Sequence, residues 1–329
     1  MVHLGLIGCG NVAVNRHLPA LRSMQGAKVV ALADTNGARL TEVADQYGVA
    51  HRYRDHHALL ADPDVGAVAV LTPTASHVQI ALDALEADKH VLIEKPLGLN
   101  LDSCDRLIAQ AAGSHRKVMV GFNSRWHPLV RRARAKIRHG TLGQVQAIRS
   151  AFTKWRSPEY GPEWKRSREL GGGALINEGV HHFDLWHYLI GSRVENVWSV
   201  TQGTAEQDDE TVIVAGKMTD GVLATALFSL GTGCENIIEI YGTDGWMRVS
   251  PYRFDGLEFH PRAEYSGDTA SRLRRLMGMM KQLPDAVRLS RHGGSFAASF
   301  RAEWKHFVDS IHGDREPACT LQDGKRALQ

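Results

Sequence analysis

Two residues of this chain, Lys95 and His181, stand in sequence contexts that suit proton transfer. Pro96 follows the lysine and disfavours helical geometry there, which restricts where the ammonium can lie. An ammonium so placed could polarise a hydroxyl or a carbonyl group. His181 offers an imidazole whose pKa normally lies near neutrality, as a general base for alcohol oxidation requires. Both residue types are also common in surface turns and structural helices, so their surroundings decide their roles.

A glycine-rich stretch, residues 171–184, surrounds the histidine and reads GGGALINEGVHHFD. If it is helical, Asn177, His181 and Asp184 fall at i, i+4 and i+7 and share one face. No metal site is predicted at His181, His182 and His187. They lack the H-E-x-x-H spacing, and adjacent helical side chains diverge by about a quarter turn. The chain also lacks the G-x-S-x-G pattern of a serine nucleophile.

The first residues of the chain predict a dinucleotide site. An apolar run, Leu4–Ile7, leads into residues 8–13, Gly-Cys-Gly-Asn-Val-Ala, which fit G-x-G-x-x-G/A. Gly8 permits a tight turn, Gly10 lets the backbone approach a pyrophosphate, and Ala13 allows close packing of helix on strand. The pyrophosphate would then lie at a helix N-terminus, where backbone N–H groups point at it.

A second apolar run, Val29–Ala33, ends in Asp34, 24 residues after Gly10. The dinucleotide pattern expects an acid near this place to hold the adenosine ribose hydroxyls. A carboxylate repels a 2′-phosphate, and neither Thr35 nor Asn36 offers a cation, so we expect NAD rather than NADP. The alternative is a turn residue at a strand end, where Asp is common.

Polar residues also follow two further predicted strands, at the carboxyl edge where parallel sheets bind ligands. Thr72 and His77 could line the nicotinamide half of the cofactor or form a strand-to-helix cap. The predicted cofactor-binding residues are Gly8, Gly10, Asn11, Val12, Asp34, Thr72, Pro73, His77, Glu94 and Lys95.

The elements that would position these residues alternate as in a doubly wound α/β fold. Strands are predicted at 4–7, 29–33, 67–71, 91–93 and 118–120, and helices at about 14–23, 37–47, 77–87 and 101–112. Beyond residue 121 the pattern predicts a helix at 129–138 and strands at 144–155, 194–203, 210–218, 222–229 and 237–241. We therefore predict a Rossmann domain over residues 1–121 and, over residues 122–329, an α+β domain with a large, mostly antiparallel sheet.

The composition is that of an ordinary globular chain. Its 329 residues are 43% hydrophobic and 23% charged, without an apolar stretch long enough to cross a bilayer. The net charge of +3 is too small to indicate nucleic acid binding. The four cysteines lack C-x-x-C spacing, which is typical of reduced thiols. Because the first strand begins almost at Met1, we expect no signal sequence and a cytoplasmic protein.

A basic segment, residues 271–291, carries many cations and a single acid, Asp285. Its apolar residues recur at helical spacing, while Gly278 and Pro284 predict an interrupted helix. The segment could be a solvated basic face, a lid for a phosphate- or nucleotide-linked substrate, a membrane-surface helix or an oligomer contact. Another short helix, with Asp323 as its N-cap, is predicted at the end of the sequence.

Together these motifs resemble the glucose-fructose oxidoreductase, inositol dehydrogenase and MocA (Gfo/Idh/MocA) family. The resemblance runs from residue 2 to about residue 326 and rests on residues 8–13, Asp34, Thr72-Pro73, Glu94-Lys95-Pro96, Asn123-Ser124-Arg125, Gly171-Gly172-Gly173, Gly179-Val180-His181 and Asp184. It implies NAD(P)-dependent oxidation or reduction of a secondary alcohol of a sugar, sugar derivative or cyclitol. It also implies that the second domain binds substrate and that a homodimer or homotetramer forms through its sheet.

The resemblance further implies roles for single residues. Lys95 would contact substrate and nicotinamide, and His181 would be the catalytic acid/base. One position departs from the family, which usually has Asp where this chain has Asn177. An amide can bind a sugar hydroxyl but cannot stabilise an imidazolium as a carboxylate would. The expected substrate-binding residues are Asn177, Asp184, Arg125 and Trp164.

Two other functions are compatible with the same residues. A hydrolase or lyase could keep NAD bound and oxidise a sugar carbon transiently to acidify a neighbouring C–H group, which would cleave a glycoside without net NADH. A cofactor-sensing regulator could keep the Rossmann fold without turnover. The presence of both Lys95 and His181 argues against the regulator, which has no need for an acid/base pair.

Overall fold

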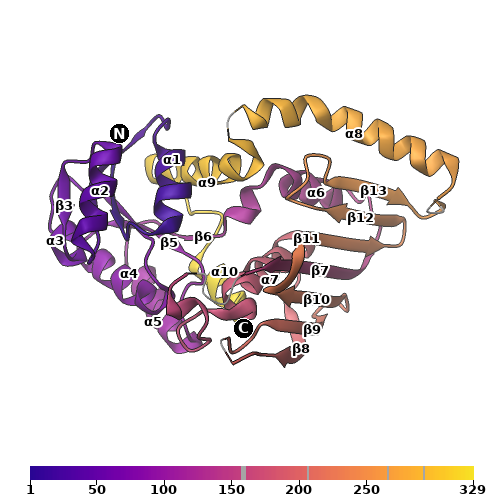
Figure 1. The fold of residues 1–329 in the computed structure, drawn as a ribbon, viewed down its shortest axis with the longest axis horizontal. Helices are drawn as coiled ribbons and strands as arrows, with labels where there is room; N and C mark the ends of the chain where they lie inside the picture. Colours follow the sequence, from indigo (N-terminus) through magenta and orange to yellow (C-terminus); the bar gives the residue numbers. More distant parts are fainter. Residues whose placement is uncertain (157–160, 206, 265–266, 292) are drawn as a thin grey trace. The chain divides into compact units, whose positions relative to one another are not determined.

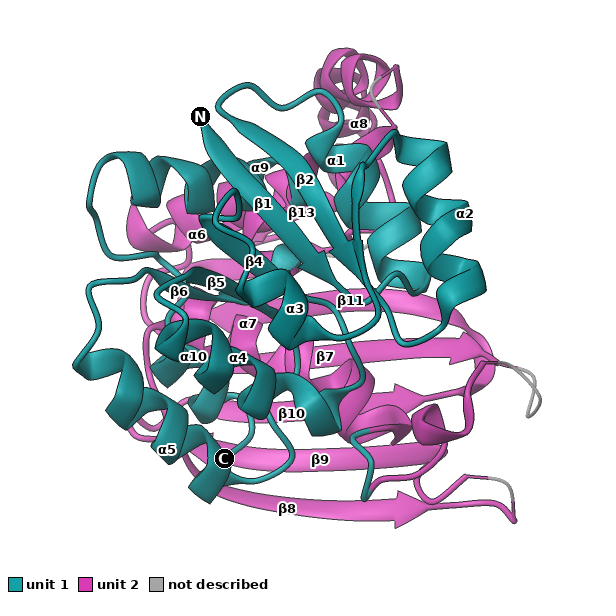
Figure 2. Cartoon of the chain, turned by 90° about the vertical axis from the view of Figure 1, so that its left-hand side faces the viewer, with its two compact units in different colours: residues 1–123, 169–171, 300–329 teal, residues 124–168, 172–299 magenta. Residues whose placement is uncertain are grey.

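The computed structural model describes residues 1–156, 161–205, 207–264, 267–291 and 293–329 (Figure 1). The chain forms two compact units, each defined by the contacts among its own residues (Figure 2). Unit 1 contains residues 1–123, 169–171 and 300–329, and unit 2 contains residues 124–168 and 172–299. The last residues of the chain thus group with its first residues.

Unit 1 is built on a six-stranded sheet whose neighbouring strands all run parallel. The order is β3-β2-β1-β4-β5-β6, with bounds Val2–Ile7 (β1), Ala27–Ala33 (β2), His51–Tyr53 (β3), Ala67–Val70 (β4), His90–Glu94 (β5) and Val118–Gly121 (β6). All four side chains of β4 are buried, because both faces of such a sheet are covered. This burial explains the continuous apolar runs and confirms the predicted doubly wound parallel sheet.

Unit 1 also contains helices and short turns. They are η1 (Ala13–His17), α1 (Leu18–Leu21), α2 (Gly37–Tyr47), α3 (His56–Leu60), η2 (Thr74–Ser76), α4 (His77–Glu86), α5 (Leu101–Ala112), α10 (Leu321–Arg326) and the part of α9 (Gly294–His312) that begins at residue 300. The α5 helix begins at Asn100, whose side chain accepts a hydrogen bond from the Ser103 N–H. The predicted bounds of α2 and α5 are confirmed.

Two helix predictions need correction. The expected single helix at 14–23 is a π-helical turn, η1, followed by α1. Pro19 lies in the first turn of α1 and has no N–H to donate backwards, and the π-helical turn directly before it changes the hydrogen-bond pattern at this point. The N-cap of α10 is Thr320 rather than Asp323, which instead completes a capping box.

Unit 2 is built on a seven-stranded sheet with the order β13-β12-β11-β7-β10-β9-β8. The bounds are Val145–Trp155 (β7), Val194–Gln202 (β8), Thr211–Met218 (β9), Leu223–Ser229 (β10), Gly231–Gly242 (β11), Gly245–Val249 (β12) and Leu257–Pro261 (β13). The β7–β10 pair is parallel and the other pairs are antiparallel, so the mostly antiparallel prediction is confirmed. The sequence pattern did not predict β12 or β13.

One face of this sheet carries the core of unit 2. Helices α6 (Pro128–Arg138) and α7 (Val180–Ile190) contribute Val130, Leu185 and Trp186 to one buried cluster with Phe228 and Ile238 from the strands. Along β9, side chains alternate between buried and exposed positions. The opposite face therefore remains open over β8, β9 and β10. The other short turns of unit 2 are η3 (Asn123–Trp126, beginning in unit 1), η4 (Glu163–Lys165) and η5 (Gly173–Gly179).

The basic segment forms one continuous helix, α8 (Thr269–Ser290), so the predicted interruption is wrong. Pro284 lies inside the helix and removes the hydrogen bond that would end on the Met280 carbonyl. Met280 is 62% exposed, so we infer that water can satisfy the carbonyl on this side. None of the helices in the described part of the chain has the length and apolar character needed to span a membrane.

A buried chain of hydrogen bonds joins α9 to the sheet of unit 1. The Trp304 indole Nε1–H donates to His17 Nδ1 (3.0 Å), and His17 Nε2 lies 2.9 Å from Glu94 Oε1. Because an indole only donates, Nδ1 is the acceptor and Nε2 carries the proton donated to Glu94. The Lys95 backbone N–H in turn donates to Glu94 Oε2 (3.0 Å). The side chains of Trp304 and His17 are fully buried.

A second acid, Glu303, lies buried beside this chain of hydrogen bonds. Neither carboxyl oxygen has a hydrogen-bond partner among the described residues. Burial, and then the nearby charge of Glu94, raise the pKa of Glu303 well above that of an ordinary glutamic acid. We infer that Glu303 is protonated in the folded protein at neutral pH.

We predict that Glu303→Gln raises the melting temperature, and by more at pH 8 than at pH 5. The folded chain holds a proton on Glu303 that the unfolded chain releases above about pH 4.3, so the wild type loses stability as pH rises. The amide has no proton to release. Thermal melts followed by circular dichroism at both pH values measure this, with the exposed Glu42→Gln as control. A gain that is equal at both pH values, or no gain, would contradict a protonated Glu303.

Candidate active site

The glycine turn after β1 is shaped by a close backbone approach. Gly8 has φ +101°, and a Cβ there would lie 2.8 Å from the Leu71 carbonyl oxygen, so only glycine fits. Its N–H donates to the Ala33 carbonyl (2.8 Å). At Gly10 a Cβ would meet nothing within 4 Å, which leaves the open backbone that a pyrophosphate needs. The turn therefore has the form that the sequence predicts for a dinucleotide site.

Asp34 holds this turn from the end of β2. Its Oδ2 accepts from the Cys9 N–H (2.8 Å) and its Oδ1 from the Asn36 N–H (2.7 Å). Each carboxylate oxygen keeps a further lone pair, so the group can still accept from ribose hydroxyls. Burial, and then the charge of Asp34, raise the pKa of the Cys9 thiol to about 12, so Cys9 stays protonated.

Two arginines near Asp34 were missed by the sequence reasoning. Arg54 donates to the Thr35 carbonyl (2.7 Å), and the charge of Arg39 acts on the Cys9 thiol. Arg39 is five residues and Arg54 twenty residues beyond Asp34, outside the two positions, Thr35 and Asn36, at which the sequence reasoning looked for a cation. The carboxylate of Asp34 is thus what opposes a 2′-phosphate here, and the donor set fits NAD.

His77 braces the loops that follow β4 and β5. Its Nδ1 lies 2.7 Å from the Pro96 carbonyl oxygen and its Nε2 lies 2.8 Å from that of Thr72. Burial lowers the pKa of His77, so a neutral ring donates to one of these carbonyls at a time. Ser76 also donates to the Thr72 hydroxyl (2.8 Å). These contacts give His77 a structural use, and its contact with cofactor stays a prediction.

Lys95 lies at the carboxyl edge of the unit 1 sheet, directly after β5. Glu94 accepts from its backbone N–H, as described above, and His77 holds the next residue, Pro96. The backbone on both sides of the lysine is therefore fixed. The Glu94-Lys95-Pro96 motif was predicted, but His17 and Trp304, which hold Glu94, were not. Nothing in the local sequence around His17, Ala-Val-Asn-Arg-His-Leu, pointed to a contact with Glu94.

In unit 2, His181 lies in the first turn of α7 and is partly exposed. Its Nδ1 is 3.5 Å from the Ser124 hydroxyl. The neighbouring His182 is buried, and burial lowers its pKa to about 4, so it stays neutral and away from solvent. Of the two adjacent histidines, His181 is therefore the one suited to exchange a proton with a substrate.

Arg125 and Asp184, both predicted to bind substrate, bind each other. Arg125 Nε lies 2.8 Å from Asp184 Oδ2, and Nη2 lies 2.5 Å from Oδ1. Both side chains are buried, and the Arg125 guanidinium also lies over the Tyr188 ring at 5.1 Å. This bidentate pair joins the segment of Ser124 to the helix of His181, so we assign it a bracing role.

The expected face of Asn177, His181 and Asp184 is altered because residues 173–179 form a π-helical turn, η5. A π turn changes the angular spacing that an α-helix would give, and such turns are frequent at functional sites. Asn177 is buried, and its amide donates to Glu178 Oε1 (3.3 Å). The same oxygen accepts from Lys154 Nζ and Arg156 Nη2, both at 2.7 Å.

Glycine is required at the start of this turn. Gly173 has φ +83°, and a Cβ there would lie 1.6 Å from Asp209 Oδ1. Asp209 Oδ2 accepts from the Leu175 N–H (2.9 Å), which fixes the entry of the turn. Trp164, in η4, is partly exposed with the Lys165 ammonium 5.7 Å from its ring centre. A stacking role for Trp164 stays a prediction.

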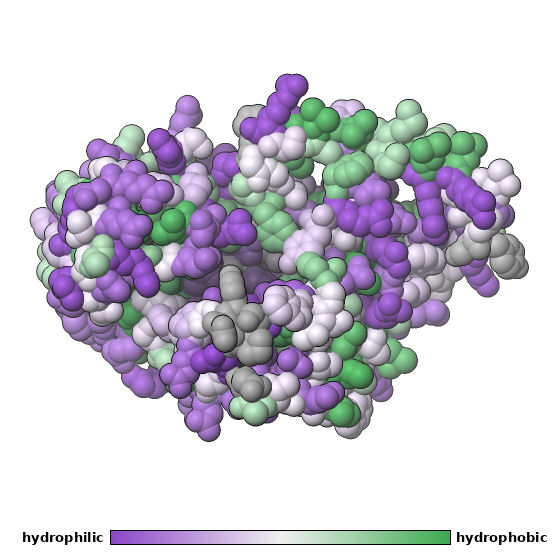
Figure 3. Space-filling model, in the orientation of Figure 1, coloured by the Kyte–Doolittle hydropathy of each residue, from purple (hydrophilic) through white to green (hydrophobic). Residues whose placement is uncertain are grey.

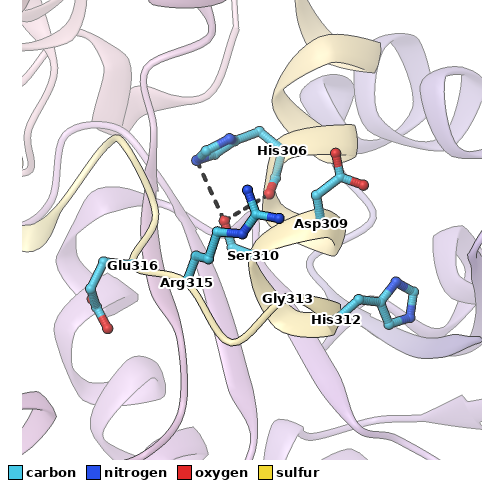
Figure 4. A pocket seen from close by; sticks show the side chains of 7 residues that line it. All are labelled: His306, Asp309, Ser310, His312, Gly313, Arg315 and Glu316. Atoms are coloured by element: carbon cyan, nitrogen blue, oxygen red, sulfur yellow. Dashed lines mark hydrogen bonds between the residues drawn. The ribbon is translucent and has the colours of Figure 1, made fainter.

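An open pocket of about 420 Å³ lies at the C-terminal end of α9 (Figure 4). Its lining residues are His306, Asp309, Ser310, His312, Gly313, Arg315 and Glu316. Lys117, just before β6, donates to Glu316 (3.1 Å), so the pocket lies at the amino edge of the sheet. Parallel sheets bind ligands at the opposite edge, so this pocket is not the cofactor site.

Both the N-terminal and the C-terminal part of the chain match models of known protein families. Residues 2–122 match the family described as "Oxidoreductase family, NAD-binding Rossmann fold", and residues 130–248 match the "GFO/IDH/MocA C-terminal domain". A myo-inositol 2-dehydrogenase of Thermotoga maritima is 28% identical, over 99% of this chain and 93% of the relative. A dTDP-3,4-didehydro-2,6-dideoxy-alpha-D-glucose 3-reductase of Actinomadura kijaniata is 30% identical, over 75% of this chain and 74% of the relative.

Solved structures share the fold. The WlbA dehydrogenase of Bordetella pertussis, in complex with NADH and UDP-GlcNAcA, has a TM-score of 0.84 at 22% identity over 99% of this chain and 92% of that one. The scyllo-inositol dehydrogenase of Lactobacillus casei, with bound NAD(H) and scyllo-inositol, has a TM-score of 0.78 at 22% identity. The match covers 99% of this chain and 94% of that one. With the glycine turn, Asp34 and two family matches that cover most of its length, the chain belongs to the Gfo/Idh/MocA family of NAD-binding oxidoreductases.

Proposed function

We propose that this oxidoreductase transfers a hydride between nicotinamide and a secondary alcohol of a sugar, sugar derivative or cyclitol. The observation that carries the proposal is the fixed Lys95 at the carboxyl edge of a sheet that also presents the glycine turn and Asp34. Relatives named as an inositol dehydrogenase and a dTDP-sugar reductase support this class of substrate. NAD, when bound, supplies the hydride acceptor.

Lys95 has the role of stabilising negative charge on the substrate oxygen. As the alcohol gives up its carbon-bound hydride, the oxygen must lose a proton and becomes a carbonyl. An ammonium beside that oxygen lowers the cost of the alkoxide character that develops first. The fixed backbone around Lys95 limits the space that its ammonium can search, which favours positioning.

His181 has the role of taking the alcohol proton. Its Nδ1 is near the Ser124 hydroxyl, so the proton would go to Nε2. Asn177 would bind a substrate hydroxyl as a neutral group. In the reverse direction the same imidazole would return the proton to the alcohol oxygen.

The proposal is tested by mixing the protein and NAD with a panel of free sugars, inositols, sugar acids and nucleotide sugars, and following NADH by absorbance. On the substrate found, we predict that Lys95→Ala and His181→Asn each lower kcat by about a hundredfold or more. Lys305→Ala, at an exposed lysine of α9, is the matched control and should leave kcat unchanged.

Two results would contradict this assignment. Full activity in either variant would remove that residue from the reaction. Protein that binds NAD but forms no NADH with any compound would point to the transient-oxidation hydrolase or to the regulator. Cleavage of a glycoside would then identify the hydrolase.

We predict that Asp34→Ser shifts the cofactor preference towards NADP, raising kcat/KM with NADP by about tenfold or more. The change removes the carboxylate that repels a 2′-phosphate and leaves Arg39 and Arg54 nearby. Serine can still accept one of the two backbone hydrogen bonds. Steady-state kinetics with both cofactors measure the ratio, and Asp45→Ser is a control that removes an exposed acid of α2. An unchanged ratio would show that Asp34 does not select the cofactor.

The open sheet face of unit 2 supports the proposed homodimer or homotetramer. Val200 on β8 pairs with Ile213 on β9, which pairs with Leu227 on β10, and the three are 74%, 59% and 37% exposed. Trp198, on the same face as Val200, is 63% exposed. An apolar row across three strands is the kind of surface that a second copy covers.

We predict that Ile213→Glu reduces the oligomer to smaller species, because it would bury a charge at this face. Light scattering after size-exclusion chromatography measures the mass, and Lys305→Glu, at an exposed lysine of α9 outside this face, is a control for charge alone. A wild-type monomer at micromolar concentration, or an Ile213→Glu variant of unchanged mass, would contradict assembly through this face.

A further inference from the structure

The α8 helix presents its apolar side outward. The outward residues are Leu273 (55% exposed), Leu276 (50%), Met277 (45%), Met280 (62%), Leu283 (50%) and Val287 (45%). At 3.6 residues per turn these positions fall within an arc of about 120°. In the space-filling view they contribute to the hydrophobic colour along this helix (Figure 3). We call these six residues the α8 apolar face.

The opposite side of α8 attaches the helix to unit 2 through polar groups. Ser271 and Gln282 are its buried residues, 1% and 5% exposed. Gln282 donates to the Leu257 carbonyl (3.2 Å) at the start of β13, and the Asp268 side chain caps the helix. A surface helix of a globular domain normally buries its apolar stripe and exposes its polar one. The α8 helix has the reverse arrangement, which indicates that something else covers the apolar face.

Cations lie on both sides of the α8 apolar face: at about 100° per residue Arg272 falls beside one edge and Lys281 beside the other, whereas Arg275 falls on the side that attaches to unit 2. The segment 271–291 carries six, Arg272, Arg274, Arg275, Lys281, Arg288 and Arg291, against one acid, Asp285. Arg274 pairs with Glu264 (3.3 Å) and Arg288 with Asp285 (3.5 Å). Among the described residues, no ion pair forms at Arg272, Arg275 or Lys281. The surface is thus apolar at its centre and positively charged at its rim.

The positive charge distinguishes between two partners that could cover the α8 apolar face, a second copy of the helix and a lipid surface. A second α8 packed against the first would bring two strongly basic helices together, and like charges across an interface are unfavourable. An anionic lipid surface instead offers acyl chains to the apolar side and phosphates to the cations. A helix of 22 residues lying flat would cover about 33 Å of such a surface.

We propose that α8 docks this protein on membranes that contain anionic phospholipid. The helix lies in the interface, with its apolar face among the upper acyl chains and Arg272 and Lys281 at the headgroups. Binding of this kind is peripheral and reversible. It would hold the enzyme close to substrates made or used at a membrane surface, and it does not depend on which sugar the enzyme oxidises.

The test is co-flotation of the full-length protein with vesicles of phosphatidylcholine alone or with added phosphatidylglycerol, at low and at physiological salt. We expect flotation with the anionic vesicles only, weakened by salt because the headgroup attraction is screened. The double variant Leu276→Glu, Met280→Glu should abolish it. Removal of either cation at the edges of the face, Arg272→Ala or Lys281→Ala, should cost about fivefold in the partition constant.

The matched control is the double variant Lys28→Ala, Lys305→Ala, which removes two exposed cations outside α8 and should float as the wild type does. Far-ultraviolet circular dichroism and NAD binding establish that each variant is folded. Wild-type protein that fails to float with anionic vesicles at low salt would overturn the proposal. So would a Leu276→Glu, Met280→Glu variant that floats normally, or one whose defect is a lower oligomer mass or a weaker affinity for a nucleotide sugar.

Discussion

The hydrogen bond between His17 and Glu94 joins three segments that lie far apart in the sequence. His17 belongs to the turn after the glycine motif, Glu94 ends β5, and Trp304 on α9 fixes the tautomer of the imidazole. Because Glu94 also accepts from the Lys95 N–H, the position of the proposed catalytic lysine depends on this buried contact. The cost is a crowded acidic interior, where Glu303 must remain protonated. The buried Glu303 therefore lowers the stability of the fold, while the neighbouring Glu94 holds the backbone of Lys95.

Much of the fold could be predicted because burial on both faces of a parallel sheet leaves a plain signal. The strands β1, β2, β4, β5 and β6 are continuous apolar runs and were predicted. The short β3 was missed because its residues, His51–Tyr53, are polar and only partly buried. Strands β12 and β13 interleave charged or polar residues with apolar ones, so their pairing partners identify them better than their own sequences do. In α8, local rules for Gly278 and Pro284 predicted a break, but solvent on the outer side allows the helix to continue.

In the candidate site, too, some features could be predicted from the sequence and others could not. The turn at Gly8 and Gly10 and the place of Asp34 beside it could be predicted, because a turn and the end of the next strand are a matter of spacing along the chain. By contrast, Glu178 is surrounded by Lys154, Arg156 and the Asn177 amide only once the chain has folded. The pairing of Arg125 with Asp184 likewise uses residues that sequence reasoning assigned to the substrate. Local geometry can be read from spacing, whereas partners brought together by packing cannot.

Hydride transfer is the central claim, and isotope transfer tests it most directly. A substrate from the panel, labelled with deuterium at the alcohol carbon, is incubated with the protein and NAD, and both products are analysed by mass spectrometry. We expect deuterium on the reduced nicotinamide in amounts equal to the oxidised sugar or cyclitol. Deuterium that stays in a cleaved sugar, without net NADH, would contradict the account and show that oxidation is only transient.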